Sequence, residues 1–309
     1  MPSTSTRERF STALSIQWEA QRPSFEATLR QQETLPEEAV AMAVSLEGVM
    51  APMKEGTRQA KRHDALSKGK APRGPAGDQE GGCATVSYAA CGGERRLTRR
   101  MARRPEPTKA PLKGPLTAEV MGAWGQRPDV PVVQVAEGTA DNWTYLGDPL
   151  PVGEDVLAFS HAVDHLSDAL GAAYGEGTSP YHERFTTLRA VLRDAPQGVD
   201  KVLGALGRLR SRYPRRQAIH KTIAYFREHR HRMRYPDLRA QLLPIGSGVV
   251  EAAGKTLVSQ RLQRAGMRWR GPGGQAIWTF RAFCQASALH GRGRYSPRGT
   301  NGRAPCLGR

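Results

Sequence analysis

The segment Val40–Gly48 reads VAMAVSLEG, and the segment Val130–Gly138 reads VPVVQVAEG. Each is a short run of β-branched and small apolar residues that ends in an acid followed by glycine. Runs of this length and composition are typical of buried strands. We therefore predict strands over 40–46 and 130–135, each ending one or two residues before its acidic residue.

Working outward, further strand and helix patterns surround these two segments. The stretches CATVSYAAC, from Cys83, and RRLTRRMARR, from Arg95, alternate like the two strands of a hairpin, joined by a turn at Cys91–Glu94. Leu116–Gly125 has the composition of a modest helix. Strands that alternate with helices predict a mixed α/β sheet.

The remaining segments are expected to be helices and loops. Residues 11–33 have helical spacing and are expected to break at Pro23, while the Lys/Gly/Pro-rich residues 54–82 predict a long exposed loop. From Asp155 onward the apolar spacing is helical. The last helix is expected over Gln275–Leu289.

Composition excludes several classes of protein. The 309 residues contain no run of 18 apolar residues, which argues against a membrane-spanning helix, and the N-terminus lacks the layout of a secretory signal. The four cysteines are too scattered for a disulfide framework, and none has the spacing of a zinc site. The expected compartment is the cytoplasm, with no membrane partner.

The positive charge is concentrated in the last third of the chain. The whole chain has a net charge of +17; from Arg208 to Arg309, 22 lysines and arginines stand against three acids. Such a field favours a polyanion as partner, because each neutralised phosphate releases condensed counterions. Nucleic acid is the first candidate, and a basic region that only aids solubility is the alternative.

Three acids are candidate metal ligands. Glu47 and Glu137 follow the two predicted buried strands, and Glu251 lies in the first turn of a helix opened by Pro244–Gly248. Carboxylates that meet at the strand ends of an open sheet could hold one or two Mg²⁺ ions for phosphodiester chemistry. Alternatively, an acid before glycine starts a turn, and Glu251 favours the positive end of its helix.

Several long sequence blocks resemble one known family. They are VSLEGVMAPMKEGTRQAKR, RGPAGDQEGGCATVSY, AEGTADNWTYL, FREHRHRMRYPDLRA and LPIGSGVVEAAGKTLVSQRLQRAGMRWRGPGGQAIWTFRA. These blocks resemble insertion-sequence transposases of the ISKra-four family, and the match extends in register over roughly residues 11–289.

The resemblance implies a fold and an activity. It implies an RNase H-like α/β core over 39–289 with a helical insertion at about 150–243, preceded by a helical segment over 1–38. It also implies Mg²⁺-dependent DNA cleavage and strand transfer, with Mn²⁺ as a substitute, at terminal inverted repeats and target DNA. A homo-oligomer on DNA, associated with the nucleoid, is expected, and residues 290–309 are expected to be a disordered basic tail.

Carried onto this chain, the family's acidic triad falls on Glu47, Glu137 and Glu251. The family is expected to have Asp at the first two positions, and the extra methylene of Glu displaces each carboxylate by about 1.5 Å. Asp141 is a weaker candidate ligand. Gly254 stands where the family has Cys, so the chain resembles a truncated or degenerate copy. The alternative is therefore a catalytically dead DNA-binding remnant.

Basic and aromatic residues after Glu251 are candidate DNA contacts. These residues are Lys255, Arg261, Arg264, Arg268, Trp269 and Arg270. Arginine forks suit phosphates, and an indole ring suits an unpaired base. The alternatives are a solvated face for the cations and core packing for Trp269. The stretch Arg227–Arg239 is expected to follow a DNA backbone without reading bases.

Two other interpretations are weaker. His161 and His165 have the i, i+4 spacing of a metal-binding helix, but a structural face is favoured because the zinc-protease glutamate is missing. A basic RNA-associated protein is a further alternative from another class, as is a chain that does not fold stably.

Overall fold

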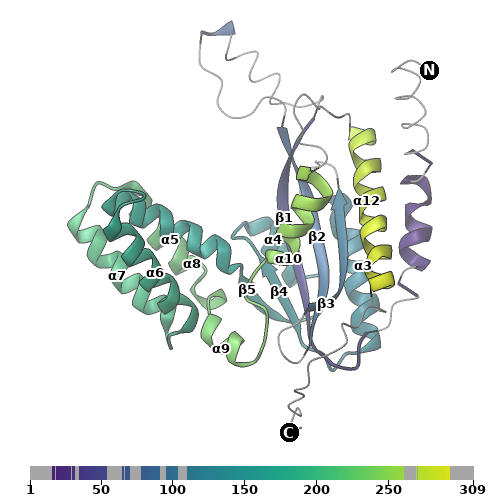
Figure 1. Ribbon diagram of the computed structural model, residues 1–309, viewed down its shortest axis with the longest axis horizontal. Helices are drawn as coiled ribbons and strands as arrows, with labels where there is room; N and C mark the ends of the chain where they lie inside the picture. Colours follow the sequence, from purple (N-terminus) through teal and green to yellow (C-terminus); the bar gives the residue numbers. More distant parts are fainter. Residues whose placement is uncertain are drawn as a thin grey trace.

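The structure is a computed structural model, shown in Figure 1. The part described here comprises residues 16–17, 19–28, 30–31, 35–53, 65, 67–69, 78–90, 95–103, 110–260, 269 and 271–292. The predicted turn at 91–94 and residues 293–309 of the predicted tail lie outside these ranges.

A five-stranded mixed sheet forms the centre of the molecule. Its strands are β1 (Ala39–Pro52), β2 (Asp78–Ala90), β3 (Arg95–Arg103), β4 (Val132–Ala136) and β5 (Glu154–Leu157). They lie in the order β3-β2-β1-β4-β5. The first three pair as an antiparallel meander, while β4 and β5 run parallel to β1. This is an RNase H-like arrangement, and it confirms the predicted fold class.

Strand β1 is longer than the apolar pattern indicates. Its parallel pairing with β4 stops at Leu46, opposite Ala136, but its antiparallel pairing with β2 continues to Pro52, opposite Asp78. The prediction that the strand ends at Leu46 was therefore wrong, and so was the predicted loop over 78–82, which is the start of β2. The hairpin partner supplies backbone hydrogen bonds that extend the strand past its most apolar part.

Helices cover the sheet and form a separate bundle. They are α3 (Ala110–Gln126), α4 (Ala140–Gly147), α5 (Phe159–Tyr174), α6 (Ser179–Asp194), α7 (Gly198–Arg212), α8 (Gln217–Glu228), η2 (Arg230–Arg232), α9 (Tyr235–Ala240), α10 (Gly248–Gly254), η3 (Lys255–Ser259) and α12 (Gly271–Arg292). Helices α5 to α8 pack in a ring, each against its neighbours in sequence, with α8 closing against α5. The bundle projects to one side of the sheet (Figure 1).

The start of the helical region differs from the prediction. Asp155 and Val156 belong to β5 and not to a helix, and Val156 is fully buried beside Val135 of β4. The short strand was missed because four residues are too few for a period to be visible.

Two apolar clusters lie on the two faces of β1. Leu46 packs in the larger cluster together with Leu112 and Leu116 of α3. Val49 and Ala51 pack in the smaller cluster, which residues of α10, η3 and α12 complete. Helix α10 lies in front of β1 and β2 in Figure 1. The odd-numbered residues of this part of β1, Glu47 among them, therefore point toward α10.

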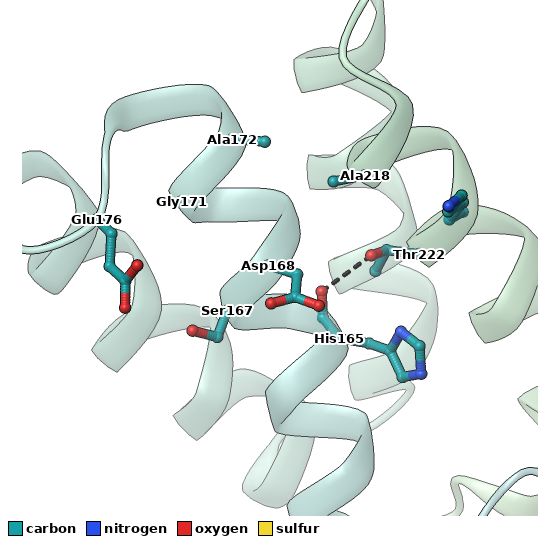
Figure 2. A pocket seen from close by; sticks show the side chains of 9 residues that line it. His165, Ser167, Asp168, Gly171, Ala172, Glu176, Ala218 and Thr222 are labelled. Atoms are coloured by element: carbon teal, nitrogen blue, oxygen red, sulfur yellow. Dashed lines mark hydrogen bonds between the residues drawn. The ribbon is translucent and has the colours of Figure 1, made fainter. Parts of the chain in front are cut away.

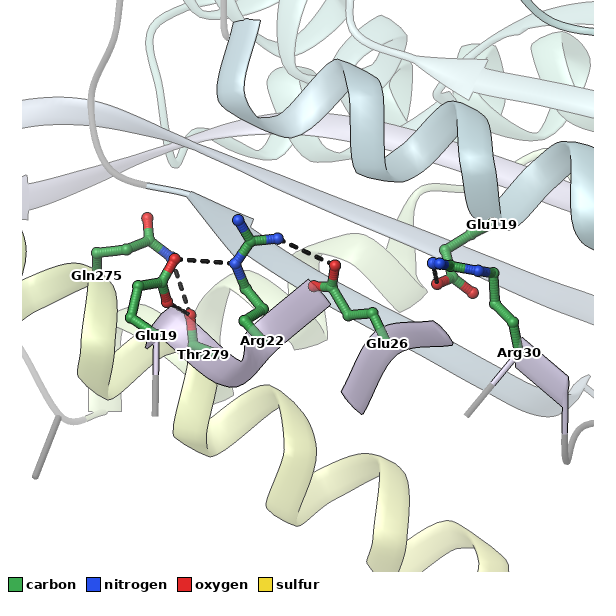
Figure 3. Close-up of polar contacts among 7 residues, drawn as sticks. All are labelled: Glu19, Arg22, Glu26, Arg30, Glu119, Gln275 and Thr279. Carbon is green, nitrogen blue, oxygen red and sulfur yellow. Dashed lines mark hydrogen bonds and ion pairs between the residues drawn. The ribbon is translucent and has the colours of Figure 1, made fainter. Parts of the chain in front are cut away.

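The N-terminal helical segment passes through Pro23, contrary to the predicted break. Arg22 forms ion pairs with Glu19 at 2.8 Å and with Glu26 at 3.0 Å. Thr279 of α12 donates a hydrogen bond to Glu19 (Figure 3). Contacts within the segment and with α12 thus act against the local cost of proline, about 3 kcal/mol in a helix interior.

Candidate carboxylate site at the sheet edge

Glu47 and Glu137 occupy corresponding positions on neighbouring strands. Leu46 and Ala136 form the last register pair between β1 and β4, and the two glutamates are the next residue on each chain. Adjacent strands are about 4.8 Å apart, so the two backbones are close here. The Oε2 atom of Glu47 is shielded from solvent.

Glu251 reaches this region from α10. That helix packs on β1 so closely that a Cβ at Gly254 would lie 2.7 Å from Cγ2 of Val49. The Glu251 carboxylate accepts a hydrogen bond from Ser160 Oγ at 2.7 Å and another from Ser247 Oγ. Because Ser160 is in the first turn of α5, directly after β5, it holds the Glu251 carboxylate near the end of the parallel strands.

The glycine after Glu137 has a steric role. A Cβ at position 138 would lie 2.5 Å from the Tyr225 ring and 2.8 Å from Nε2 of His229. Helix α8 therefore closes directly onto the end of β4. Burial, and then the charge of Glu137, raise the pKa of Tyr225 to about 12, although a backbone hydrogen bond from Gly138 acts in the opposite direction.

An aromatic cluster surrounds this contact. The ring of His165 stacks on Tyr225 at 3.8 Å between centroids, and His229 lies edge-on to Tyr225 at 4.7 Å. Arg232 lies 4.0 Å above the ring of Trp143. Burial lowers the pKa of both His165 and His229. The structure thus gives His165 a packing contact, consistent with the structural interpretation of His161 and His165.

A polar pocket of about 480 Å³ lies near His165, between α5 and α8. Its lining includes Asp168, Glu176 and Lys221, and Thr222 donates a hydrogen bond to the carbonyl of His165 at 2.9 Å (Figure 2). None of the predicted site residues lines this pocket, so it is separate from the carboxylate site.

The acids share one region of the fold but do not form a metal cage. Among the described residues, no group of three His, Cys, Asp or Glu side chains is placed to hold a metal ion. Carboxylate oxygens are suitable Mg²⁺ ligands, but Glu47, Glu137 and Glu251 do not fit the ion in this arrangement. Asp141, the weaker candidate ligand, instead pairs with Lys113 of α3 at 2.9 Å.

Only two of the six predicted DNA contacts lie in the described part of the chain. Lys255 is exposed and forms no ion pair with any described residue. Trp269 packs against the cluster under α10, and its backbone N–H donates to the carbonyl of Pro52 at 3.0 Å. The other four, Arg261, Arg264, Arg268 and Arg270, lie outside it.

Sequence reasoning missed the residues that surround the acids. Ser160 and Tyr225 come from helices far along the chain, and no local pattern marks them. Ser247 was within reach of such reasoning, because it lies one turn before Glu251 at the start of the same helix. Glu80 of β2 was also missed; its carboxylate lies over Gly48.

Comparisons with known proteins add little. No protein-family model matches the chain, and no curated protein matches it. A solved structure, the strand transfer complex of the Drosophila P element transposase, aligns with 95% of this chain and 74% of its own at 10% identity, with a TM-score of 0.28. An alignment with that score does not establish a common fold. Among the described residues, no helix is long and apolar enough to cross a membrane.

Proposed function

We propose that this chain is a DNA transposase of the insertion-sequence type, which cuts and joins DNA at terminal inverted repeats. The observation that carries the proposal is the register of β1 and β4, whose last pair, Leu46 and Ala136, directly precedes Glu47 and Glu137, with the helix of Glu251 packed on β1. The sequence blocks that resemble the ISKra-four family support it. Target DNA, assembly of several copies on DNA and a nucleoid location belong to the same proposal.

The three acids are the proposed catalytic residues and the proposed ligands of Mg²⁺ or Mn²⁺. Since they do not fit a metal ion as arranged here, no reaction step is assigned to the ion. What the chain itself supplies is position. Ser160 and Ser247 orient Glu251, and Tyr225 packs against the segment that follows Glu137.

A second candidate is a DNA-binding remnant without catalytic activity. It is favoured by the same ungrouped arrangement of the acids and by the presence of Glu at the first two positions. Mg²⁺ requires near-ideal octahedral geometry, and a misplacement of about 1 Å can reduce a rate on the order of 100-fold.

A cleavage assay distinguishes these candidates. DNA carrying the flanking terminal repeats is incubated with Mg²⁺ or Mn²⁺ and with the native chain, the Glu47→Asp/Glu137→Asp variant or Glu251→Gln. An active transposase cuts in native form and loses its metal-dependent cutting with Glu251→Gln. A remnant cuts only after the double reversion.

The matched control is Glu183→Gln, which removes one exposed acid from α6 in the bundle. It is expected to leave cleavage and Mn²⁺ binding unchanged. A calorimetric Mn²⁺ titration of the same variants tests the ligands without reference to activity. Cleavage that survives Glu251→Gln, or Mn²⁺ binding that is equal in all variants, would contradict the triad assignment.

A further inference from the structure

The helical bundle carries a long segment of one charge. Residues 201–227, which span most of α7 and α8, contain eight lysines and arginines and no acid. The whole segment lies in the described part of the chain, so the partners of these side chains among the described residues are known. In the bundle, the lysines and arginines that pair with described acids can therefore be distinguished from those that do not.

The stretch Arg227–Arg239, which the sequence predicted to follow a DNA backbone, uses most of its arginines in ion pairs within the chain. Four of its arginines pair with acids of the bundle or of β5. The pairs are Arg230 with Asp200, Arg232 with Asp155, Arg234 with Glu154, and Arg239 with Asp194. These contacts join the segment after α8 to α6, α7 and β5. Most of the charge in Arg227–Arg239 thus stabilises the fold.

Helix α7 carries a stripe of exposed cations that do not pair with described acids. Lys201, Arg208 and Arg212 are seven and four residues apart, which at about 100° per residue places them within an arc of roughly 40° around the helix. Arg215 and Arg216 follow in the turn before α8. All five are exposed, and none forms an ion pair within the described chain. We call these five residues the α7 stripe.

The stripe faces away from the core of the bundle. The buried side of α7, formed by Val202, Leu206 and Leu209, is centred roughly 110° around the helix from Lys201. In the ring of four helices α7 packs on α6 and α8 and lies diagonally opposite α5, the helix that follows β5. It forms the outer side of the bundle in Figure 1. The stripe is thus open to a large partner.

The chemistry of the stripe fits phosphate. Four of its five members are arginines, whose planar guanidinium groups bind phosphate oxygens in pairs. At 1.5 Å per residue, Lys201 and Arg212 are about 16 Å apart, a distance over which duplex DNA carries about ten phosphates. No large hydrophobic side chain of α5 to α8 is exposed, and a membrane-surface helix requires such side chains.

We propose that the α7 stripe is a docking surface for the phosphate backbone of duplex DNA. The inference rests on the proposed action on DNA. It adds a second surface, on the helical bundle, that binds the duplex at a distance from the carboxylates of the sheet. It assigns backbone contact to Lys201–Arg216 in place of Arg227–Arg239. Such contacts position the duplex and read no bases.

The test is the salt dependence of DNA binding. Binding of a labelled duplex is measured by fluorescence anisotropy at several KCl concentrations for the native chain and for Arg208→Gln/Arg212→Gln/Arg216→Gln. Each lost phosphate contact reduces the slope of log K against log salt by about 0.9, so the triple variant is expected to lose 2–3 units. At 0.1 M salt its affinity is expected to fall on the order of 100-fold.

The control removes the same charge from positions that are already paired. Arg193→Gln/Arg230→Gln/Arg239→Gln is expected to keep the native slope. Circular dichroism checks folding, and the single variant Arg208→Gln, with an expected change of about 0.9, serves if a triple variant does not fold.

The outcomes separate this inference from the proposed function. Tight DNA binding with an unchanged slope in the stripe variant would overturn the stripe and leave the transposase proposal in place. Absence of DNA binding in the native chain would overturn both. Loss of binding only to anionic vesicles of phosphatidylserine, with DNA binding retained, would identify a membrane surface and also overturn the proposal.

Discussion

A single methyl group at position 254 would collide with the sheet. The Cβ of any residue larger than glycine there would lie 2.7 Å from Cγ2 of Val49, a distance that folded proteins do not tolerate. The glycine at 254 therefore has a physical reason in this fold. A cysteine at 254 requires a different residue or a different spacing at 49, so the glycine and the valine belong together.

We therefore expect Gly254→Ala to destabilise the chain by about 1–3 kcal/mol, as overpacking does, although alanine favours a helix by about 1 kcal/mol over glycine. Val49→Ala should remove the collision, so that the double variant is more stable than Gly254→Ala alone. Urea unfolding gives the three free energies. A Gly254→Ala variant as stable as the native chain would contradict the close packing of α10 on β1.

At the scale of residues, the sequence predicted the acids but not their surroundings. Glu47, Glu137 and Glu251 stand out because each follows a recognisable run or turn. Their neighbours do not stand out: Ser160 is 91 residues from Glu251, and Tyr225 meets Gly138 only because the bundle folds back onto the sheet. Such contacts depend on tertiary packing, which a local pattern does not contain.

At the scale of elements, period and composition predicted most of the sheet. Strand β4 and the β2–β3 hairpin were predicted because their residues are apolar or alternate clearly. The missed features have other causes. Strand β1 extends past Leu46 because β2 pairs with it, and β5 is too short for a period. Pro23 lies in a helical segment that contacts α12 and α3 as well as its own residues.

The N-terminal helical segment is also fixed to α3. Arg30 pairs with Glu119 at 2.8 Å, and Glu119 is only 6% exposed (Figure 3). Because a charged donor to a buried carboxylate contributes about 1.5–3 kcal/mol, we expect Arg30→Ala to lower the free energy of unfolding by this amount.

A double-mutant cycle with Glu119→Ala, measured by urea unfolding, checks the pair directly. It should give a coupling energy of about 1 kcal/mol or more. Arg22→Ala, which removes pairs only within the segment itself, is the comparison and is expected to cost less than 1 kcal/mol. Additive effects of Arg30→Ala and Glu119→Ala on the free energy of unfolding would contradict a stabilising ion pair between the segment and α3.

At the scale of the whole molecule, the junction of bundle and sheet contains titratable rings. His165 and His229 lie on the two sides of Tyr225, which contacts the end of β4. Burial lowers the pKa of both histidines. For His165, the charges of Asp168 and Asp164 oppose this shift and that of His161 reinforces it. For His229, Glu228 opposes the shift, while Arg232, His231 and His165 reinforce it.

A lowered pKa makes this junction sensitive to acid. Below the ordinary histidine pKa of about 6.5 the unfolded chain takes up protons before the folded chain does, so stability falls as the pH falls. We expect a lower free energy of unfolding at pH 5.5 than at pH 7.5, measured with urea. His165→Phe keeps a ring on Tyr225 but has no charge to gain, so its decrease should be smaller. An equal decrease in both proteins would contradict this role.

Strand β1 pairs with β2, which is synthesised soon after it, and is covered by α10, which is synthesised much later. A chain emerges from the ribosome N-terminus first and tends to fold unit by unit. The meander β1–β2–β3 and the four-helix ring are each continuous in sequence, so each has its own contacts soon after it emerges. Helix α10 comes later than both, yet it covers the face of β1 that bears Val49. A nascent chain paused before Gly248 would therefore expose that apolar face of β1. At this stage of synthesis the face is available for a chaperone to bind.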